Sequence, residues 1–401
     1  MSINRHLAHV PTGYLGTVGA LAVGQVLAWA SLYYSFSSFV LPMQHEYGWS
    51  VASMMGAYSL GTVVWGLCAY PVGAAIDQGH GRWVMAGGAC LASLGLICWA
   101  SVQALWMLYA AWLMLGLAMA MMLYEPAFTV LTRRYPNHYH QGITALTLVA
   151  GFASTLAFPA IAALQANWGW RGALWVVATV MGLIVAPVNA WALRGETPSR
   201  LSRRPHEAEA ATLHQATRTR AFWLLALTFT CYSFAQSGFW AHVIPAFASK
   251  GFTAAEALHV LVWIGPCQVG GRVLYVLAGR QWPLRRVGMV VLCGLPLSFA
   301  LFAFSQHTWA LWGFAALFGS ANGLVTIVRG GLIPEYFGRA HVGRIGGAIS
   351  TAGLLARAAA PLSVAGLLWI WPSYTEVMQC LAALGVIAVL AFTFAQKPGQ
   401  N

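Results

Sequence analysis

Residues 105–124 read LWMLYAAWLMLGLAMAMMLY, a run of 20 residues without a charged side chain. A helix of about 20 predominantly apolar residues is long enough to span the hydrocarbon core of a bilayer. The run does not alternate apolar and polar residues, as the strands of a membrane barrel do. This stretch therefore predicts a membrane-spanning α-helix.

The rest of the chain has the same character. Of its 401 residues, 59% are hydrophobic, 7% are charged and 19 are Trp. Soluble domains carry about 25% charged residues, and Trp gathers at bilayer interfaces. The composition excludes a soluble enzyme, a disordered chain and a coiled coil, and it predicts an all-α membrane protein. The seven cysteines form no Cys-x-x-Cys pair, so we expect free thiols, no metal site and no cofactor.

Twelve apolar segments can be placed along the chain, and one long polar stretch separates the sixth from the seventh. We expect an N-terminal six-helix half over residues 1–194, a cytoplasmic linker over 195–219 and a C-terminal six-helix half over 220–401. The segments cover about 14–41, 51–76, 83–102, 104–132, 142–165, 171–193, 221–247, 254–279, 287–306, 308–334, 342–368 and 375–396.

The two halves repeat each other. Pro42 and Gly48-Trp49-Ser50 follow the first segment, and Pro245 and Gly251-Phe252-Thr253 follow the seventh with the same spacing. Parallel repeats of this kind place the substrate site at the interface of the halves, near the middle of the membrane. A second matched spacing joins Gly151 and Pro159 in the fifth segment to Gly353 and Pro361 in the eleventh.

The distribution of Lys and Arg predicts the orientation. If the N-terminus is cytoplasmic, 16 of the 21 Lys and Arg residues fall in cytoplasmic segments, and only Arg171 and Lys250 fall in outer loops. Cytoplasmic loops carry such an excess. We therefore expect a multi-pass protein of the inner (plasma) membrane with both termini in the cytoplasm. The net charge of +12 reflects this orientation and not nucleic-acid binding, and we expect a monomer.

The loop after the second segment carries a motif. It reads Gly73-Ala74-Ala75-Ile76-Asp77-Gln78-Gly79-His80-Gly81-Arg82, which resembles the G-x-x-x-D-R-x-G-x-R motif of the major facilitator superfamily. Asp77 and Arg82 match, whereas Gln78 replaces a basic residue and His80 a glycine. In that family the loop helps to latch the two halves on the cytoplasmic side. The resemblance implies this role for Asp77 and Arg82; a solvated loop pair is the alternative.

The resemblance also covers the twelve segments, the two halves and the polar central stretch. It implies a secondary active transporter that works by alternating access, and not an enzyme.

Three arginines lie inside apolar segments, namely Arg272, Arg329 and Arg357, whereas the only acid well inside a segment is Glu125. An Arg at the centre of a membrane helix costs about 2.5–3.5 kcal/mol on insertion scales. A bound anion would supply the missing negative charge, and the planar guanidinium suits a carboxylate because it binds it in a bidentate manner. We therefore expect a small organic anion as substrate, moved with protons or by exchange.

Two of the arginines resemble known substrate ligands. Gln268 and Arg272 lie four residues apart on one helix face, which is similar to the D-x-x-x-R or N-x-x-x-R pair of the monocarboxylate transporters. Oxalate–formate exchangers also carry basic residues on helices eight and eleven, and the resemblance implies that Arg272 and Arg357 jointly hold a mono- or dicarboxylate. The alternatives are a structural Arg272 bonded to backbone carbonyls and an Arg357 that serves as a gate partner.

Glu125 and Arg329 lie at similar depth in the fourth and tenth segments. We interpret them as a cytoplasmic-side gate whose ion pair forms and breaks; a static pair, or Glu125 as a proton carrier, remains open. His242, Tyr33, Tyr34 and Tyr124 are candidates to line the site, with simple packing as the alternative.

Two other functions are weighed against anion transport. One is an efflux pump for an uncharged or amphipathic drug-like molecule. The other is a membrane-embedded transferase, which would need a catalytic acid or a metal cluster near an interface, whereas this sequence offers only isolated acids.

Overall fold

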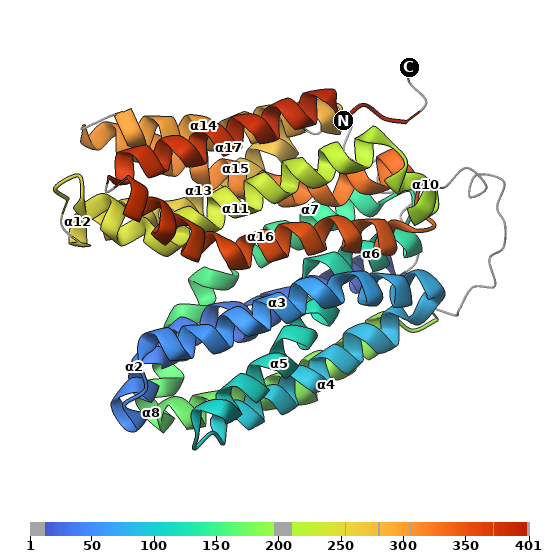
Figure 1. Cartoon of the computed structure of the whole chain (residues 1–401). Coiled ribbons are helices and arrows are strands. Elements are labelled where there is room, and N and C mark those ends of the chain that lie inside the picture. Colours follow the sequence, from blue (N-terminus) through green and yellow to red (C-terminus); the bar gives the residue numbers. More distant parts are fainter. Residues whose placement is uncertain are drawn as a thin grey trace. The chain divides into compact units, whose positions relative to one another are not determined.

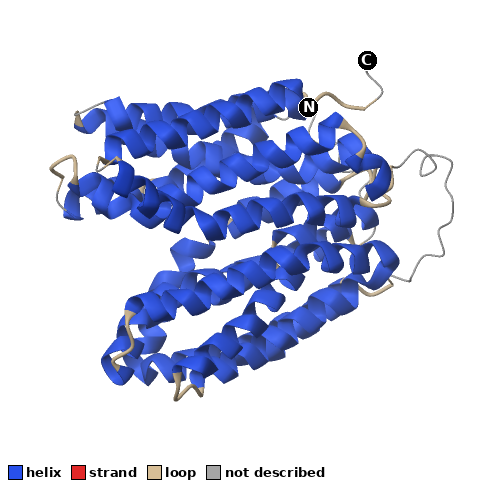
Figure 2. Ribbon diagram, in the orientation of Figure 1, coloured by secondary structure: helices blue, strands red, loops and turns tan. Residues whose placement is uncertain are grey.

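The computed structural model describes residues 13–195, 211–252, 254–279, 281–304, 307–371 and 373–398. Within these ranges every regular element is a helix (Figure 2). In a bilayer core the backbone finds no water, so each spanning segment satisfies its own N–H and C=O groups as a helix. Side chains complete some helix ends: the Ser50 hydroxyl accepts the Ser53 N–H at 3.1 Å, and the Thr219 hydroxyl accepts the Phe222 N–H at 3.3 Å.

The helices account for all twelve predicted segments. Nine stretches of the described chain are long and apolar enough to cross a membrane. Two of them, Ser53–Ala100 and Tyr139–Ala192, each hold two of the predicted segments, because the chain turns at Gly79 (φ 88°) and Gly169 (φ 65°). These positive φ values are readily adopted only by glycine. The remaining predicted segment, the seventh, is a single helix of 29 residues, α11 (Arg220–Ala248). The predicted all-α, multi-span architecture is confirmed.

The chain divides into two compact units. The first comprises Met1–Ala210 together with Gly338–Gly347, and the second comprises Ala211–Phe337 together with Ala348–Asn401. The short segment Gly338–Gly347 therefore packs with the first unit, although it lies late in the sequence.

In the first unit, π-helical turns occur at Trp29–Tyr34, Ile76–His80 and Met181–Val185, and one predicted helix is broken. A π-turn, Trp29–Tyr34, joins the first two helices, and the fourth predicted segment divides at Leu123, whose backbone is extended. Figure 1 labels most of the elements. They are α1 (Tyr14–Ala28), α2 (Ser35–Tyr47), α3 (Val51–Ala75), α4 (Gly81–Ala100), α5 (Leu105–Met122), α6 (Tyr124–Arg134), α7 (Tyr139–Ala150), α8 (Ala153–Val180) and α9 (Ala186–Ala192).

The second unit is built on long helices. Helix α14 packs against α15 and α17, and α11 packs against α17 (Figure 1). A cluster of Phe rings fills the space between α11, α14 and α15, with Phe239 and Phe318 at 5.0 Å between ring centroids. The elements are α10 (Leu213–Thr217), α11, α12 (Ala254–Val262), α13 (Ile264–Leu274), α14 (Leu284–Phe304), α15 (Thr308–Phe337), α16 (Val342–Ile370), whose first residues belong to the first unit, and α17 (Tyr374–Phe394).

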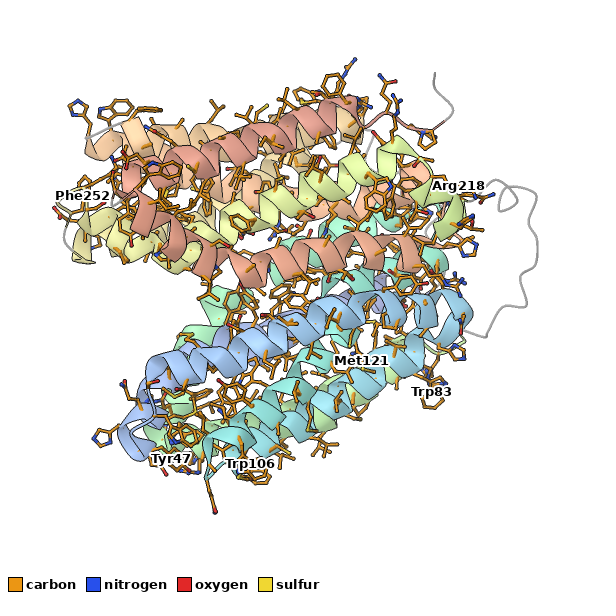
Figure 3. All side chains as sticks on the ribbon, viewed as in Figure 1. Tyr47, Trp83, Trp106, Met121, Arg218 and Phe252 are labelled. Carbon is orange, nitrogen blue, oxygen red and sulfur yellow. The ribbon has the colours of Figure 1, made fainter. Side chains whose placement is uncertain are left out.

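Large apolar side chains are exposed on both units. Trp83 and Trp106 project from the outside of the first unit (Figure 3), with 68% and 71% of their surface exposed. In the second unit Leu277 and Leu362 are 77% and 80% exposed. Extended apolar surface of this kind marks contact with a membrane.

Candidate functional site

Helices α13 and α15 touch backbone to backbone in the second unit. A Cβ atom at Gly323 would overlap the carbonyl oxygen of Gln268, and one at Gly319 would lie 2.7 Å from Cys267 Cβ. Only glycine permits this approach. This contact places Cys267 and Gln268 of α13 against the backbone of α15.

Arg272 uses this close approach. Its side chain is buried, with 3% of the residue exposed, and its Nε donates to the Gly323 carbonyl oxygen at 2.8 Å. Gln268, one turn earlier on α13, is half-buried. The hydrogen bond to Gly323 fixes the orientation of the guanidinium plane. Arg272 is therefore bonded to a backbone carbonyl, as the structural alternative to a substrate-binding role predicts.

A second polar pair adjoins this anchor. The buried Tyr232 hydroxyl on α11 donates to Asn322 Oδ1 on α15 at 2.8 Å. Because Asn322 directly precedes Gly323, the Tyr232–Asn322 pair lies next to the carbonyl that holds Arg272. Sequence reasoning did not single out either residue.

Arg357 of α16 lies against α11, the helix that carries Tyr232. It is half-buried on α16, its Nη2 donates to Gln236 Oε1 at 3.4 Å, and its charge acts on the Tyr232 phenol. Gln236 lies one turn after Tyr232 on α11, so the two side chains share a helix face. The structure therefore places Arg272 against Gly323 of α15, next to Asn322, and Arg357 against Gln236 of α11, one turn from Tyr232.

A proline explains how α16 is fixed here. Pro361 has no N–H, so the carbonyl of Arg357, four residues earlier, lacks its helical donor. The Ser237 hydroxyl on α11 donates to that carbonyl at 2.9 Å. One turn further along, His242 Nε2 lies 3.1 Å from the Pro361 carbonyl oxygen, and His242 Nδ1 lies 3.3 Å from the Tyr374 hydroxyl of α17. His242 thus joins α11, α16 and α17.

The predicted tyrosines gather in the first unit, around a tryptophan that was not predicted. The Trp29 ring lies 4.9 Å from Tyr124, 5.2 Å from Tyr33 and 6.4 Å from Tyr34, measured between ring centroids. Trp65 adds a fourth ring at 6.0 Å. The π-turn Trp29–Tyr34 brings Trp29 and the two consecutive tyrosines into this group.

Glu125 lies at a helix break in the first unit. Pro126 leaves the Met122 carbonyl without a helical donor, and the buried Gln25 side chain of α1 donates to that carbonyl instead. Glu125 then falls in the first turn of α6, where the helix dipole favours a negative charge. Arg329, half-buried on α15, belongs to the second unit, and its pairing with Glu125 stays a prediction.

The side chain of Asp77 is buried, and its partners lie within the first unit. Its carboxylate accepts the N–H groups of Gly343 at 3.0 Å and Arg344 at 2.7 Å, which open α16, and Arg133 Nη1 lies 3.6 Å away. The N–H groups of a first helical turn have no partner within the helix, so Asp77 fills that role. Arg133 is a cation beside it, and the Arg82 guanidinium lies over Trp83, 5.2 Å from the ring centroid; the predicted role of Asp77 and Arg82 as a latch stays a prediction.

Two prolines in the sequence indicate hydrogen-bonding partners that the sequence alone did not identify. Pro126 and Pro361 each predict a carbonyl in need of a donor four residues earlier, and Gln25 and Ser237 are those donors. No comparable pattern marks Tyr232, Asn322 or Arg133, whose partners come from distant parts of the sequence.

Comparison with known proteins gives one family and one fold. The family model described as Major Facilitator Superfamily matches residues 21–361. No curated protein sequence matches the chain. A single-residue variant of the E. coli fucose:proton symporter FucP is similar, with 13% identity, a TM-score of 0.74, and coverage of 96% of this chain and 99% of that one.

Two further structures are similar to the same extent. The human organic anion transporter MFSD10 (TETRAN) shows 17% identity and a TM-score of 0.73, over 96% of this chain and all of that one (100%). FucP in the outward conformation shows 12% identity and a TM-score of 0.72, over 96% and 99%. At such low identity these likenesses show the fold alone.

Proposed function

We propose a substrate class and a binding site for this chain, which belongs to the major facilitator superfamily. Members of that family are multi-pass membrane transporters that work by alternating access, and they are not enzymes. The substrate proposed here is a small organic anion, a mono- or dicarboxylate, moved together with protons or by exchange. The proposal places both termini in the cytoplasm and the monomeric protein in the inner membrane.

The position of the charges in the second unit carries the proposal. Arg272 and Arg357 lie within α13 and α16, whereas the three acids of the unit lie toward helix ends. Burying a charge in a membrane is costly unless another charge compensates it. A carboxylate bound by these arginines would provide that compensation. The acids are Glu256 and Glu376, in the first turns of α12 and α17, and Glu335, near the end of α15.

The contacts of the two arginines support distinct roles. Because Nε of Arg272 is bound to the Gly323 carbonyl, a carboxylate would approach the guanidinium from the side of its Nη atoms. Arg357 makes a longer contact, 3.4 Å, to the neutral amide of Gln236, which a charged ligand would replace at little cost. Gln268 and the Tyr232 hydroxyl are neighbouring hydrogen-bonding groups. On this basis we propose that the chain resembles the monocarboxylate or oxalate–formate branch of the superfamily, with Gln268 in place of its Asp or Asn and Arg357 in place of its Lys.

An uncharged or amphipathic drug-like substrate is the second candidate. The group of four rings around Trp29 in the first unit offers the apolar and aromatic surface that such a molecule needs. MFSD10, an organic anion transporter, and FucP, a fucose:proton symporter, have the same fold, and their substrates differ. The choice between an anionic and an uncharged substrate therefore depends on the charged residues of this chain.

Transport by purified protein in proteoliposomes tests the proposal. The panel contains labelled mono- and dicarboxylates, an uncharged sugar and an uncharged amphipathic dye. Each is measured with and without a pH gradient, and with and without unlabelled anion inside. We expect uptake of at least one carboxylate and no uptake of the sugar. Transport of the dye alone would contradict the anion assignment.

Three variants then test the site. Arg272→Ala should lower affinity for the best anion about tenfold to a hundredfold, because a charge-assisted hydrogen bond contributes about 1.5–3 kcal/mol. Arg272→Lys should lower the affinity to a similar extent, since Lys cannot reproduce the bidentate contact of a guanidinium. Arg218→Ala is the matched control, because Arg218 is exposed outside the spans (Figure 3) and an exposed charge is screened. Unchanged affinity in Arg272→Ala would overturn the site.

A further inference from the structure

An open cavity lies near the start of α14 in the second unit. Its volume is about 460 Å³, and it is lined by Trp282, Arg286, Met289 and Val290. Helix α14 packs against α15 and α17, whereas Trp282, Arg286 and Val290 are exposed and Met289 is half-buried. The cavity therefore lies on the face of α14 that is turned away from its neighbours. Its volume is in the range of small-molecule sites, and three of its four lining side chains are apolar.

The apolar lining continues along the same face of α14. Val290, Leu297 and Phe304 are all exposed, and they follow one another at intervals of seven residues, nearly two turns of a helix. Val290 and Leu297 come four and eleven residues after Arg286, about 6 Å and 16 Å along the helix. One leaflet of a bilayer contributes about 15 Å of hydrocarbon. The exposed stripe thus has the length of an acyl chain whose head group lies at Arg286.

The two consecutive arginines at the start of α14 differ in their contacts. Arg285 Nη2 donates to the Thr393 carbonyl at 2.6 Å, and its Nη1 donates to the Ala395 carbonyl at 2.9 Å. Arg285 therefore holds the end of α17. The guanidinium of Arg286 is exposed and makes no hydrogen bond or ion pair with any described residue. Its charge can be compensated by a ligand from outside the protein.

The contacts of Arg285 also show at which end of the unit the cavity lies. Thr393 and Ala395 are at the C-terminal end of α17, so the cavity is at that end too. In the orientation proposed above this end faces the cytoplasm, and the cytoplasmic leaflet carries anionic lipids. Trp is typical of the level at which the head groups meet the hydrocarbon, and Trp282 lines the cavity.

We propose that this cavity binds an anionic phospholipid of the surrounding membrane. The phosphate meets the guanidinium of Arg286, because that group binds phosphate oxygens in a bidentate manner. An acyl chain runs over Met289 and Val290 toward Leu297. A phosphatidylcholine carries its own cation beside the phosphate, so the site prefers a lipid with net negative charge. The inference does not depend on the transported substrate; only the choice of leaflet rests on the proposed orientation.

Lipid binding to the full-length purified protein tests the inference. Native mass spectrometry in detergent gives the affinity of the first bound phosphatidylglycerol and of phosphatidylcholine with the same acyl chains. We expect phosphatidylglycerol to bind about fivefold more tightly, the contribution of one basic residue near a membrane surface. Equal affinity for the two lipids would contradict the inference. Inorganic phosphate, which has no acyl chain, should release the lipid only in large excess; release at an equal concentration would exclude a lipid as the natural occupant.

Two substitutions that remove the same charge locate the site. Arg286→Gln should lower the affinity for phosphatidylglycerol about fivefold and leave the affinity for phosphatidylcholine unchanged. Arg218→Gln, at an exposed position outside the spans (Figure 3), should bind both lipids like the parent. A general attraction of anionic lipid by the net charge of +12 would weaken equally in both variants, and that result would overturn the site. So would parental affinity in Arg286→Gln.

A larger side chain in the cavity tests its apolar part independently of the charge. Val290→Trp fills the cavity and keeps the surface apolar, so the protein should still fold in a membrane. Its affinity for phosphatidylglycerol should fall about tenfold, the equivalent of about two buried methylene groups. Leu362→Trp makes the corresponding change at an exposed position of α16 and should have no effect. Parental affinity in Val290→Trp would show that the lipid does not lie in this cavity. If the protein transports no anion, the proposed function fails and the lipid site stands.

Discussion

Gly323→Ala should disturb the anion site through the backbone alone. The new Cβ would lie 3.0 Å from both the carbonyl carbon and the Cα atom of Gln268, whereas non-bonded carbons prefer about 3.5–4.0 Å. Helices α13 and α15 must therefore separate by about 0.5–1 Å. The same movement stretches the 2.8 Å bond from Arg272 Nε to the Gly323 carbonyl to about 3.3–3.8 Å, at or beyond the limit of a hydrogen bond.

Two measurable consequences follow from this separation. Overpacking in a tight contact costs about 1–3 kcal/mol, so the apparent melting temperature in detergent should fall. Arg272 also loses its fixed orientation, and we expect affinity for the best anion to fall about tenfold, the equivalent of about 1.4 kcal/mol. Ligand binding and thermal unfolding, measured on the same purified sample, separate the two effects.

The control is a glycine on α13, the helix that carries Arg272, at a position with room for a methyl group. Gly270 lies on α13, two residues before Arg272, and a Cβ there would meet no atom within 4 Å. Gly270→Ala should leave affinity unchanged and should stabilise the helix by about 0.5–1 kcal/mol. If Gly323→Ala binds the anion as tightly as the parent and melts at the same temperature, the close approach of α13 and α15 does not position Arg272.

Three further changes test other parts of the molecule. Asp77→Asn leaves one acceptor oxygen for the two N–H groups of Gly343 and Arg344. Hydrogen–deuterium exchange at one or both amides should therefore speed up about tenfold. Unchanged exchange at both amides would show that Asp77 does not hold the start of α16. Glu125→Gln should alter the transport rate more than substrate affinity, because a gate residue sets the energy gap between inward and outward states; a pure affinity loss would contradict that role. Burial, and then the charges of Arg344 and Arg133, lower the pKa of His341. The unfolded chain therefore takes up this proton first, and stability should fall as the pH drops through about 6.5; His341→Gln should reduce that loss in thermal unfolding, and an identical pH profile would exclude His341 as its source.

The architecture could be read from the sequence because the bilayer restricts the choice. A run such as residues 105–124 has one stable arrangement in hydrocarbon, a helix, since nothing else satisfies its backbone. Twelve such segments and the polar stretch after residue 193 therefore predict the observed helices. The predicted anion-binding arginines also follow from the sequence, because a charge inside an apolar segment is conspicuous wherever the helix packs.

The partners of those charges depend on the tertiary structure. Arg272 donates to a carbonyl 51 residues away, and the Tyr232 hydroxyl donates to Asn322, 90 residues away. The sequence indicates that Pro126 and Pro361 leave a carbonyl without a donor, but it does not show that Gln25 and Ser237 supply one.

The motif around Asp77 also shows which features the sequence predicts and which depend on the tertiary structure. The sequence places an acid in the loop before α4, and its match to a family motif draws attention to Arg82. In the folded chain the carboxylate lies against the first turn of α16, with Arg133 beside it. Hydrogen-bonding partners are selected by which helix faces meet, and that depends on the packing of whole helices and not on the local sequence around either residue.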